Sequence, residues 1–298
     1  MNSNKPIELN NNVIIENTFG NVKHQLIDEI NSKIIITHQT CQASLSLFGG
    51  HVLSWKPTGH DEVFWLSKTA VFDAKTPIRG GIPLCWPWFG PYGEAGNHGF
   101  ARTSVWQLGE VIVSEQAVEI ELILSGSDFS KFWPNSFVVK QKLIFAGTFS
   151  QQLIIENTSN EDFQFSDALH TYFSVSSPEN VAIPDLSNSS YHDKVKQISN
   201  CQPHDVFDCV GPIDKIYHHN SSATLFDKGW KRAIEVSKSN SAQWVLWNPG
   251  VELAKGFNDI HQQGEQGFVC LEAANTNWIK VAAGETACLS QEIQVYKL

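Results

Sequence analysis

Short apolar runs rich in β-branched and aromatic residues recur from one end of the chain to the other. Polar breaks containing glycine, serine or asparagine separate them at intervals close to the roughly 8–12 residues of antiparallel meanders. This pattern predicts strands at 33–37, 43–48, 52–55, 63–66, 118–124, 137–145, 153–156, 163–165, 169–175, 223–226, 233–237, 243–247, 268–272 and 287–296. The predicted fold class is all-β, an antiparallel sandwich with minimal helix.

Helix signals are scarce by comparison. One fair candidate covers residues 251–257, directly after the strand-breaking pair Pro249 and Gly250. No low-complexity linker and no repeat of fixed period divides the chain. We therefore expect one domain spanning 1–298, with residues 1–15 as a loosely attached N-terminal segment.

The composition is typical of a folded protein with a large interior. Hydrophobic residues make up 42% and charged residues 17% of the chain, whereas a typical charged share is about 25%. The formal net charge of -10 opposes binding to nucleic acid and to anionic membranes, because positive patches drive both associations. An anionic substrate would therefore need arginines gathered locally.

The start of the chain, Met1 to Pro6, has no apolar segment of signal-peptide length, and no stretch approaches the ~20 apolar residues that cross a bilayer. We expect a cytosolic protein. Its six cysteines include no Cys-x-x-Cys pair and several lie in apolar runs, so we interpret them as free core thiols. The nearest match to a zinc site has weak spacing and consists of Cys201, His204, His218 and His219.

Residues 73–103 interrupt the strand pattern. This segment combines prolines and glycines, which prevent a regular ladder, with Trp86, Trp88, Phe89, Tyr92 and Phe100. So many aromatic rings would be costly to leave in water, so we expect a long, structured loop that packs over or lines a concave surface. Aromatic rings in such a place suit the C–H faces of a sugar.

Two arginines bracket this loop, Arg79 and Arg102. The planar guanidinium fork pairs well with phosphate, which makes both residues candidates for binding a phosphorylated substrate. A plainer interpretation is that each arginine pairs with a carboxylate of this acidic chain. His98, between Asn97 and Gly99, is suited either to donating to a sugar oxygen or to capping a turn.

A histidine and a glutamate in apolar strands are candidates for acid and base. Alternation along the predicted strand 169–175 places His170 and Tyr172 on one face. Glu272 stands late in an apolar strand, where a carboxylate is expensive unless it is paired, solvated or catalytic. Singly, each residue is more often structural. Sequence spacing alone does not bring them together.

These residues fall in five short motifs. The motifs are Arg79-Gly80-Gly81-Ile82-Pro83, His98-Gly99-Phe100-Ala101-Arg102, Leu169-His170-Thr171-Tyr172, Trp247-Asn248-Pro249 and Cys270-Leu271-Glu272-Ala273-Ala274. In these motifs and in their order, the chain resembles the D-hexose-6-phosphate mutarotases, also called glucose-6-phosphate 1-epimerases, of the aldose 1-epimerase superfamily. The resemblance implies a large twisted β-supersandwich of the galactose mutarotase-like type.

The resemblance also implies a role for each matching residue. His170 would be the general acid and Glu272 the general base. The substrate-binding residues would be Arg79, Asn97, His98, Arg102 and Asp214. Asn97 stands where relatives often carry glutamine, and Lys215, after Asp214, stands where arginine is common. Asp259 receives no role.

The function implied by the resemblance is interconversion of the α and β anomers of a hexose 6-phosphate, with glucose 6-phosphate as first choice. Glu272 as carboxylate would take the O1 proton and His170 as imidazolium would protonate the ring oxygen. The reaction needs no metal, nucleotide or redox cofactor, and the chain has no Walker-type or dinucleotide-binding loop. The expected partner is a small sugar phosphate, and not nucleic acid or a membrane; the sequence indicates no particular protein partner.

Two alternatives stay open. One is an aldose mutarotase that acts on unphosphorylated sugar, from which the two arginines distinguish the leading hypothesis. The other is a non-catalytic carbohydrate-binding protein on the same sandwich, which would have no need of a converging histidine and glutamate. A glycosidase fits less well, because it ordinarily needs two catalytic carboxylates and the sequence offers one good candidate.

Overall fold

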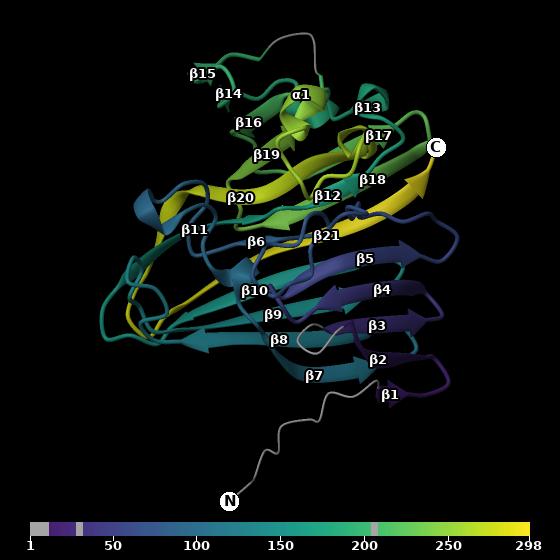
Figure 1. The fold of residues 1–298 in the computed structure, drawn as a ribbon, viewed down its shortest axis with the longest axis vertical. Coiled ribbons are helices and arrows are strands. Elements are labelled where there is room, and N and C mark those ends of the chain that lie inside the picture. Colours follow the sequence, from purple (N-terminus) through teal and green to yellow (C-terminus); the bar gives the residue numbers. More distant parts are fainter. Residues whose placement is uncertain (1–11, 28–31, 204–207) are drawn as a thin grey trace, which may run out of the picture.

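The computed structural model describes residues 12–27, 32–203 and 208–298 of the chain. Their strands form three sheets, in which neighbouring strands run antiparallel. In the view of Figure 1, β1–β5 and β7–β10 occupy the lower half, and β14, β15, β16 and α1 lie at the opposite, upper end. The predicted all-β class is confirmed.

The first sheet is a five-stranded meander in sequence order. Its strands are β1 (Val13–Glu16), β2 (Gly20–Leu26), β3 (Ser32–His38), β4 (Cys41–Ser46) and β5 (His51–Pro57). Of the segment predicted to be loosely attached, residues 1–11 lie outside the described residues. Its last part belongs to β1, which pairs with β2 at the edge of the sheet.

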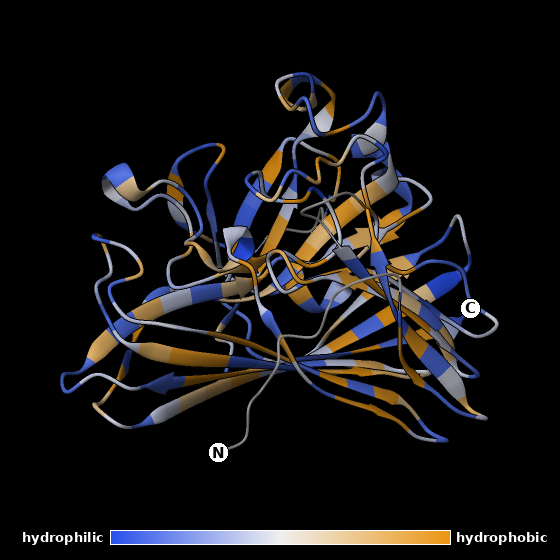
Figure 2. Cartoon of the chain, turned by 60° about the horizontal axis from the view of Figure 1, so that its bottom comes forward, coloured by the Kyte–Doolittle hydropathy of each residue, from blue (hydrophilic) through white to orange (hydrophobic). Residues whose placement is uncertain are grey.

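The second sheet has eight strands in the order β13-β17-β18-β21-β10-β9-β8-β7. The bounds are β7 (Gln107–Val113), β8 (Val118–Gly126), β9 (Phe137–Phe145), β10 (Phe149–Asn157), β13 (Val181–Ala182), β17 (Ala223–Asp227), β18 (Arg232–Ser239) and β21 (Thr286–Lys297). Along β9 and β10 every second side chain is buried, as the period of a half-buried strand requires. Figure 2 shows this alternation as orange and blue bands along the strands.

The third sheet carries the site described below. Its order is β15-β14-β16-β19-β20-β11-β6, and β12 also pairs with β20. The bounds are β6 (Leu84–Cys85), β11 (Phe163–Leu169), β12 (Tyr172–Ser174), β14 (Tyr191–Asp193), β15 (Ile198–Cys201), β16 (Ile213–Tyr217), β19 (Gln243–Asn248) and β20 (Phe268–Val281).

Helices in the described part of the chain are short. The predicted helix at 251–257 is present as α1 (Gly250–Ala254), which ends earlier than expected. The 3-10 helices are η1 (Gly93–Ala95), η2 (Ala101–Thr103), η3 (Pro178–Asn180), η4 (Pro184–Leu186) and η5 (Gly264–Gly267). Within the described ranges no helix has the length and apolar composition needed to cross a bilayer, and the cytosolic location stays a prediction.

A single large cluster of buried side chains draws on all three sheets. Within it, three aromatic rings pack together with centroids 5.4–5.9 Å apart: those of Phe64, of Trp55 in β5 and of Phe149 in β10. The structure has all six cysteines free. Cys41, Cys85, Cys209 and Cys270 are buried, as predicted, whereas Cys201 and Cys288 are only half-buried.

Two predicted strands are wrong in detail. Residues 63–66 form only isolated bridges, from Phe64 to Phe173 and from Leu66 to Gly80. The strand predicted at 169–175 is split, because β11 ends at Leu169 and β12 begins at Tyr172. In both places the pairing is decided by segments that come to lie alongside only in the folded chain. Strand propensity does not reveal such pairing.

The aromatic loop 73–103 is structured as predicted, but most of its rings serve the core. Trp86 and Trp88 are each 2% exposed. The ring of Trp86 packs against Phe100 and Phe137 at centroid distances of 5.6 and 4.9 Å. Phe89 is the aromatic residue of this loop that lines the cavity described next.

Candidate active site

One cavity of about 280 Å³ brings together all seven residues predicted for the site. They come from loop 73–103, from the third sheet and from the break between β11 and β12. The cavity lining also contains Phe89, Lys194, Val245, Trp247 and Phe257. The structure therefore gathers positions that lie nearly 200 residues apart in the chain into one site.

Strand register explains why His170 meets Glu272. The antiparallel pairing joins Leu169 to Ala273 and Tyr172 to Cys270, so His170 falls directly opposite Glu272 on β20. Residues opposite each other in an antiparallel pair project from the same face. Accordingly, His170 Nε2 and Glu272 Oε1 are 3.4 Å apart.

The same register continues into the neighbouring strands. Glu272 pairs with Val245 of β19, and Cys270 pairs with Trp247. Trp247 in turn pairs with Asp214 of β16. The floor of the cavity thus consists of two cross-strand rows, one with His170 and Glu272 and the other with Trp247 and Asp214.

A glycine-containing loop interrupts the strand at His170. The His170 N–H donates to Pro83 O at 3.1 Å, and the Tyr172 N–H donates to Gly81 O at 2.9 Å. The same loop also lies against Trp65 and Leu66, and this contact requires a residue without a side chain at Gly80, whose φ is 104° and whose Cβ would lie 2.4 Å from Trp65 O. The Arg-Gly-Gly motif therefore shapes the cavity wall that carries Arg79.

Burial controls the protonation of the histidine–glutamate pair. His170 is 9% and Glu272 is 1% exposed. Burial lowers the pKa of His170 well below 6.5, and nearby cationic groups lower it further. Burial likewise raises the pKa of Glu272 well above 4.5, and the Asp214 charge adds to the rise. The protein environment thus favours a neutral imidazole beside a protonated carboxyl, whereas the sequence-based expectation was an imidazolium beside a carboxylate.

His98 presents a hydrogen-bond donor to the cavity. Its backbone has a φ of 67°, and the Gly90 N–H donates to its Nδ1 at 3.2 Å. Burial, with neighbouring cations, lowers its pKa to about 3, so the ring is neutral and the proton resides on Nε2. This arrangement suits a donor to a sugar oxygen and also accounts for the turn.

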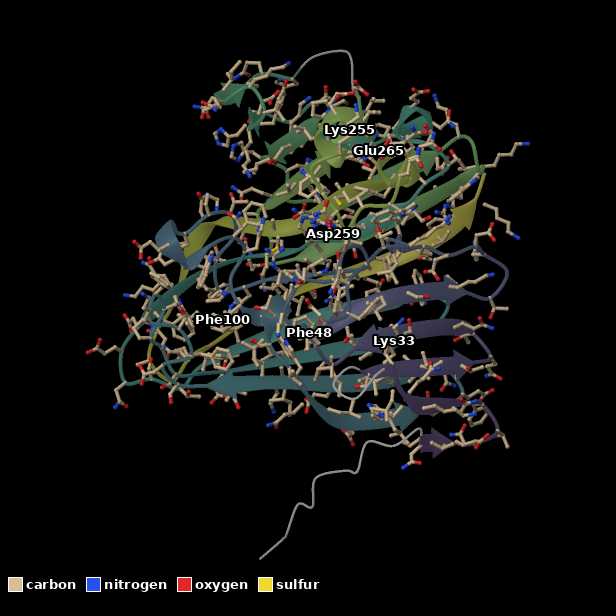
Figure 3. The ribbon with its side chains drawn as sticks, viewed as in Figure 1. Lys33, Phe48, Phe100, Lys255, Asp259 and Glu265 are labelled. Carbon is tan, nitrogen blue, oxygen red and sulfur yellow. The ribbon has the colours of Figure 1, made fainter. Side chains whose placement is uncertain are left out.

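Arg79 is held by three groups. Its Nε donates to Asp259 Oδ2 at 3.1 Å and its Nη1 donates to Tyr172 Oη at 2.9 Å. The guanidinium also lies over the ring of Phe257, 4.9 Å from its centroid. Asp259, which received no role from the sequence, therefore orients Arg79; Figure 3 labels it near the middle of the molecule, below α1.

The cavity contains two further cations with different partners. Lys194, just after β14, forms an ion pair with Asp214 at 3.2 Å. Arg102 in η2 donates from Nη2 to the backbone carbonyl of Asn97 at 3.0 Å. No ion pair between described residues involves Arg102. The plainer interpretation of the arginines thus holds for Arg79 and not for Arg102.

Aromatic rings enclose the catalytic candidates. Tyr172 stacks on His170 with ring centroids 4.9 Å apart and an angle of 10° between the planes, which confirms that the two residues share a face. The ring of Trp247 meets His170 edge-on at 5.9 Å. These contacts restrict the plane of the imidazole, and the stacked ring of Tyr172 covers one of its faces.

Comparison with known proteins places this architecture in a family. A model of the family described as "Aldose 1-epimerase" matches residues 32–294. The chain belongs to the aldose 1-epimerase family. An Escherichia coli protein named "Putative glucose-6-phosphate 1-epimerase" is 33% identical over 290 residues, covering 95% of this chain and 97% of that protein.

Solved structures agree with this family. A solved structure from Salmonella typhimurium, described as a "putative mutarotase", superposes on this chain with a TM-score of 0.87 at 30% identity. The match covers 96% of this chain and 97% of that one. A galactose mutarotase-like protein from Clostridium acetobutylicum shares the fold, with a TM-score of 0.74 at 15% identity over 95% of this chain and 100% of that one.

Some cavity residues of this aldose 1-epimerase family member were missed from the sequence. Lys194 stands in a polar segment without a motif, and no signal in the sequence distinguishes it from a solvated lysine. Trp247 belongs to one of the recognised motifs but received no role. The same holds for Tyr172, which lies behind the cavity lining and accepts a hydrogen bond from Arg79. Phe257 falls at the end of the predicted helix, three residues beyond the end of α1.

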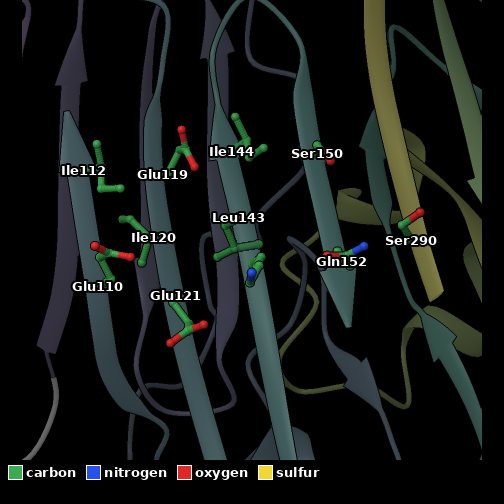
Figure 4. Close-up of a pocket in the computed structure, with 11 residues that line it drawn as sticks. Glu110, Ile112, Glu119, Ile120, Glu121, Leu143, Ile144, Ser150, Gln152 and Ser290 are labelled. Carbon is green, nitrogen blue, oxygen red and sulfur yellow. The ribbon is translucent and has the colours of Figure 1, made fainter. Parts of the chain in front are cut away.

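Another hollow, of about 300 Å³, lies on the face of β7–β10 and β21 (Figure 4). Its lining contains three carboxylates, Glu110, Glu119 and Glu121, and one cation, Lys142. The carboxylates would repel a phosphate, and no histidine is present to pair with them. This hollow therefore lacks a histidine–carboxylate pair like the one in the cavity on the third sheet.

Of the four residues in the weak zinc match, His204 lies outside the described residues. Elsewhere in the described ranges, no three histidine, cysteine, aspartate or glutamate side chains are grouped so that they could hold a metal ion.

Proposed function

We propose that this member of the aldose 1-epimerase family is a hexose-6-phosphate mutarotase, with glucose 6-phosphate as first choice of substrate. The observation that carries the proposal is the buried pair His170 and Glu272, 3.4 Å apart in a cavity that also contains arginines. A proton donor and a proton acceptor side by side are what ring opening needs. The names of the relatives support the same substrate class.

In the proposed mechanism Glu272 takes the proton from the O1 hydroxyl while His170 gives a proton to the ring oxygen. The C1–O5 bond breaks, rotation about C1–C2 turns the aldehyde, and closure on its other face reverses both transfers. This cycle starts from a carboxylate and an imidazolium. Moving one proton from Glu272 to His170 leaves the total number of protons on the pair unchanged. The form with a carboxylate and an imidazolium is therefore a tautomer of the neutral pair that burial favours.

The remaining groups would hold the sugar over this pair. His98 would donate from Nε2 to a sugar oxygen, and Asp214 would accept from a hydroxyl. Asn97 lies at the cavity and would contribute a further hydrogen bond. Trp247 and Phe89 offer apolar faces for the C–H surface of the ring.

We assign the phosphate primarily to Arg102. Arg79 already neutralises Asp259 at 3.1 Å, and Lys194 neutralises Asp214 at 3.2 Å. Arg102 has the Asn97 carbonyl as its hydrogen-bond partner, so its charge is the one most available to a dianion. Arg79 would contribute through the donors that Asp259 and Tyr172 leave unused.

We also propose that the chain forms one domain and acts in the cytosol on a small dissolved sugar phosphate, without a nucleic-acid or membrane partner. The buried cluster shared by the three sheets supports a single domain. The net charge of -10 supports the absence of polyanionic partners.

The test is two-dimensional exchange NMR between the α and β anomers of glucose 6-phosphate and, separately, of glucose. We expect the wild-type protein to accelerate exchange of the phosphorylated sugar well above the spontaneous rate. Glu272→Gln and His170→Asn should each lower kcat by roughly 10²–10⁴-fold, the usual contribution of general acid–base catalysis, with an unchanged circular dichroism spectrum. Near-normal turnover in either variant would refute its role, and acceleration of free glucose alone would make the protein an aldose mutarotase.

A further inference from the structure

A chain of hydrogen-bonded polar side chains crosses the core of the sandwich behind the active site. It consists of Gln141 on β9, Gln151 on β10, Gln291 on β21 and Thr171 in the break between β11 and β12. All four side chains are buried, and none belongs to a residue that is more than 1% exposed. The three glutamines occupy inward positions of their strands, and the neighbouring inward residues on each strand are apolar.

The hydrogen bonds run without interruption. Gln141 Nε2 donates to Gly50 O at 2.7 Å, and Gln151 Nε2 donates to Gln141 Oε1 at 2.6 Å. Gln291 Nε2 donates to both Gln151 Oε1 at 2.8 Å and Thr171 Oγ1 at 3.1 Å. Because Gly50 offers only a carbonyl to Gln141, this end sets the orientation of every amide along the chain.

Packing alone does not explain this choice of residues. Apolar side chains would fill the same inward positions without needing hydrogen-bond partners of their own, whereas a buried amide without its partner costs about 1–3 kcal/mol. A fully satisfied buried network, in contrast, specifies one arrangement of the elements that it joins. A network of this kind is therefore expected where the position of a segment has to be fixed.

Both ends of this hydrogen-bonded network lie beside residues of the active site. Thr171 directly follows His170, at the point where the ladder of β11 with β20 is interrupted. At the other end, Gly50 is followed by His51, whose Nε2 donates to Gly80 O at 2.6 Å. Gly80 directly follows Arg79. The network thus reaches the segment of the acid–base histidine and that of an arginine in the cavity.

We propose that Thr171, Gln291, Gln151 and Gln141 are positioning residues for His170. The strand break frees His170 from the regular ladder, and the Gln291–Thr171 hydrogen bond restores a single position for that segment. The imidazole is thereby held 3.4 Å from Glu272. The proposal rests on the proposed function, since it explains how the proton donor is aligned.

The test removes one hydroxyl from the interior. Thr171→Val keeps the shape of the side chain and removes one of the two acceptors of the Gln291 amide, whereas Thr171→Ser keeps the hydroxyl. Asn157→Ala is the matched control, because Asn157 is a buried amide on β10, the strand of Gln151, and bonds to Glu161 O and Val281 O at 2.9 and 3.0 Å. This variant loses buried hydrogen bonds but leaves the hydrogen-bonded network from Gln141 to Thr171 unchanged.

Each variant is measured by exchange NMR over a range of glucose 6-phosphate concentrations, which separates kcat from KM. The imidazole of His170 is followed in protein labelled with ¹⁵N-histidine, assigned with His170→Asn. We expect Thr171→Val to lower kcat roughly tenfold to a hundredfold, as a small misplacement of a catalytic group does, with KM changed less than about twofold. Thr171→Ser should restore most of the loss, and Asn157→Ala should lower the melting temperature without lowering kcat.

Unchanged kcat and unchanged His170 imidazole shifts in a folded Thr171→Val protein would overturn the proposal, and so would an equal loss of kcat in Asn157→Ala. If Thr171→Val does not fold, Gln291→Met breaks the same link from the other side and is judged by the same criteria. A failure of the proposed function is distinguishable. In that case the wild-type protein does not accelerate exchange, while the imidazole shifts still report whether Thr171 positions His170.

Discussion

Charge pairing in the cavity leads to a prediction about which arginine recognises phosphate. Arg79 and Lys194 each have a carboxylate partner, Asp259 and Asp214, whereas Arg102 donates to the Asn97 carbonyl. A phosphate dianion that approaches Arg102 displaces no existing ion pair. We therefore expect Arg102→Gln, which keeps hydrogen-bonding capacity and removes the charge, to discriminate most strongly between phosphorylated and free sugar.

The magnitude follows from the loss of a charge-assisted hydrogen bond. Such a bond contributes about 1.5–3 kcal/mol, and about 1.4 kcal/mol corresponds to tenfold, so kcat/KM for glucose 6-phosphate should fall about tenfold to a hundredfold. For free glucose, kcat/KM should change by less than about twofold, because this substrate carries no phosphate for Arg102 to bind. Arg79→Gln should discriminate less. It should also destabilise the protein, because it leaves Asp259 without its partner.

The assay is exchange NMR with both sugars, and the control is Lys255→Gln. Lys255 pairs with Glu252 on the surface at 2.7 Å, so this variant removes one positive charge outside the cavity. Equal losses on the two sugars in Arg102→Gln would refute the assignment of the phosphate. A larger discrimination in Arg79→Gln than in Arg102→Gln would refute the reasoning from charge pairing.

Two further predictions follow from buried titratable groups. Because burial lowers the pKa of His170 and raises that of Glu272, the pair should keep its one proton over a wider range than the roughly pH 4.3–6.5 set by ordinary values. The pH profile of kcat should therefore be flat across and beyond that range, and a bell confined to it would contradict the pKa shifts. Asp167 is buried, which raises its pKa from 3.8 to about 7. The folded state then binds more protons than the unfolded state across this interval, so the contribution of Asp167 to stability falls as pH rises from 3.8 through 7. Asp167→Asn should gain more unfolding free energy at pH 8 than at pH 5 in urea denaturation, and an equal gain at both would count against this account.

The regular strands could be predicted from the sequence because side-chain burial alternates along them. The strand predicted at 137–145 has the bounds of β9, Phe137–Phe145. The edge strand β15 could not be predicted in this way. Of the four residues of β15, Ile198–Cys201, three are exposed and the fourth is half-buried, so no apolar period marks the strand. Its pairing with β14 decides its structure.

The candidate site was predictable residue by residue but not in its electrostatics. The family resemblance led to the seven residues predicted for the site, and all seven line one cavity. Lys194 and the role of Asp259 depend on which charges the fold brings within reach of Asp214 and Arg79, and no local pattern encodes this. The protonation of His170 and Glu272 also depends on burial, which favours the neutral form of both side chains in place of the expected imidazolium and carboxylate.

In the proposed function, chemistry and specificity depend on different parts of the chain. His170 and Glu272 are set by the register of β20 with β11 and β12, and a slip of one residue would turn these side chains to the opposite face. Arg79 and Arg102, in contrast, belong to loop segments outside the sheet ladder. Loops tolerate substitution better than paired strands do. Changes at these arginines can therefore alter which sugar is bound while the acid–base pair, held by the sheet, stays in place.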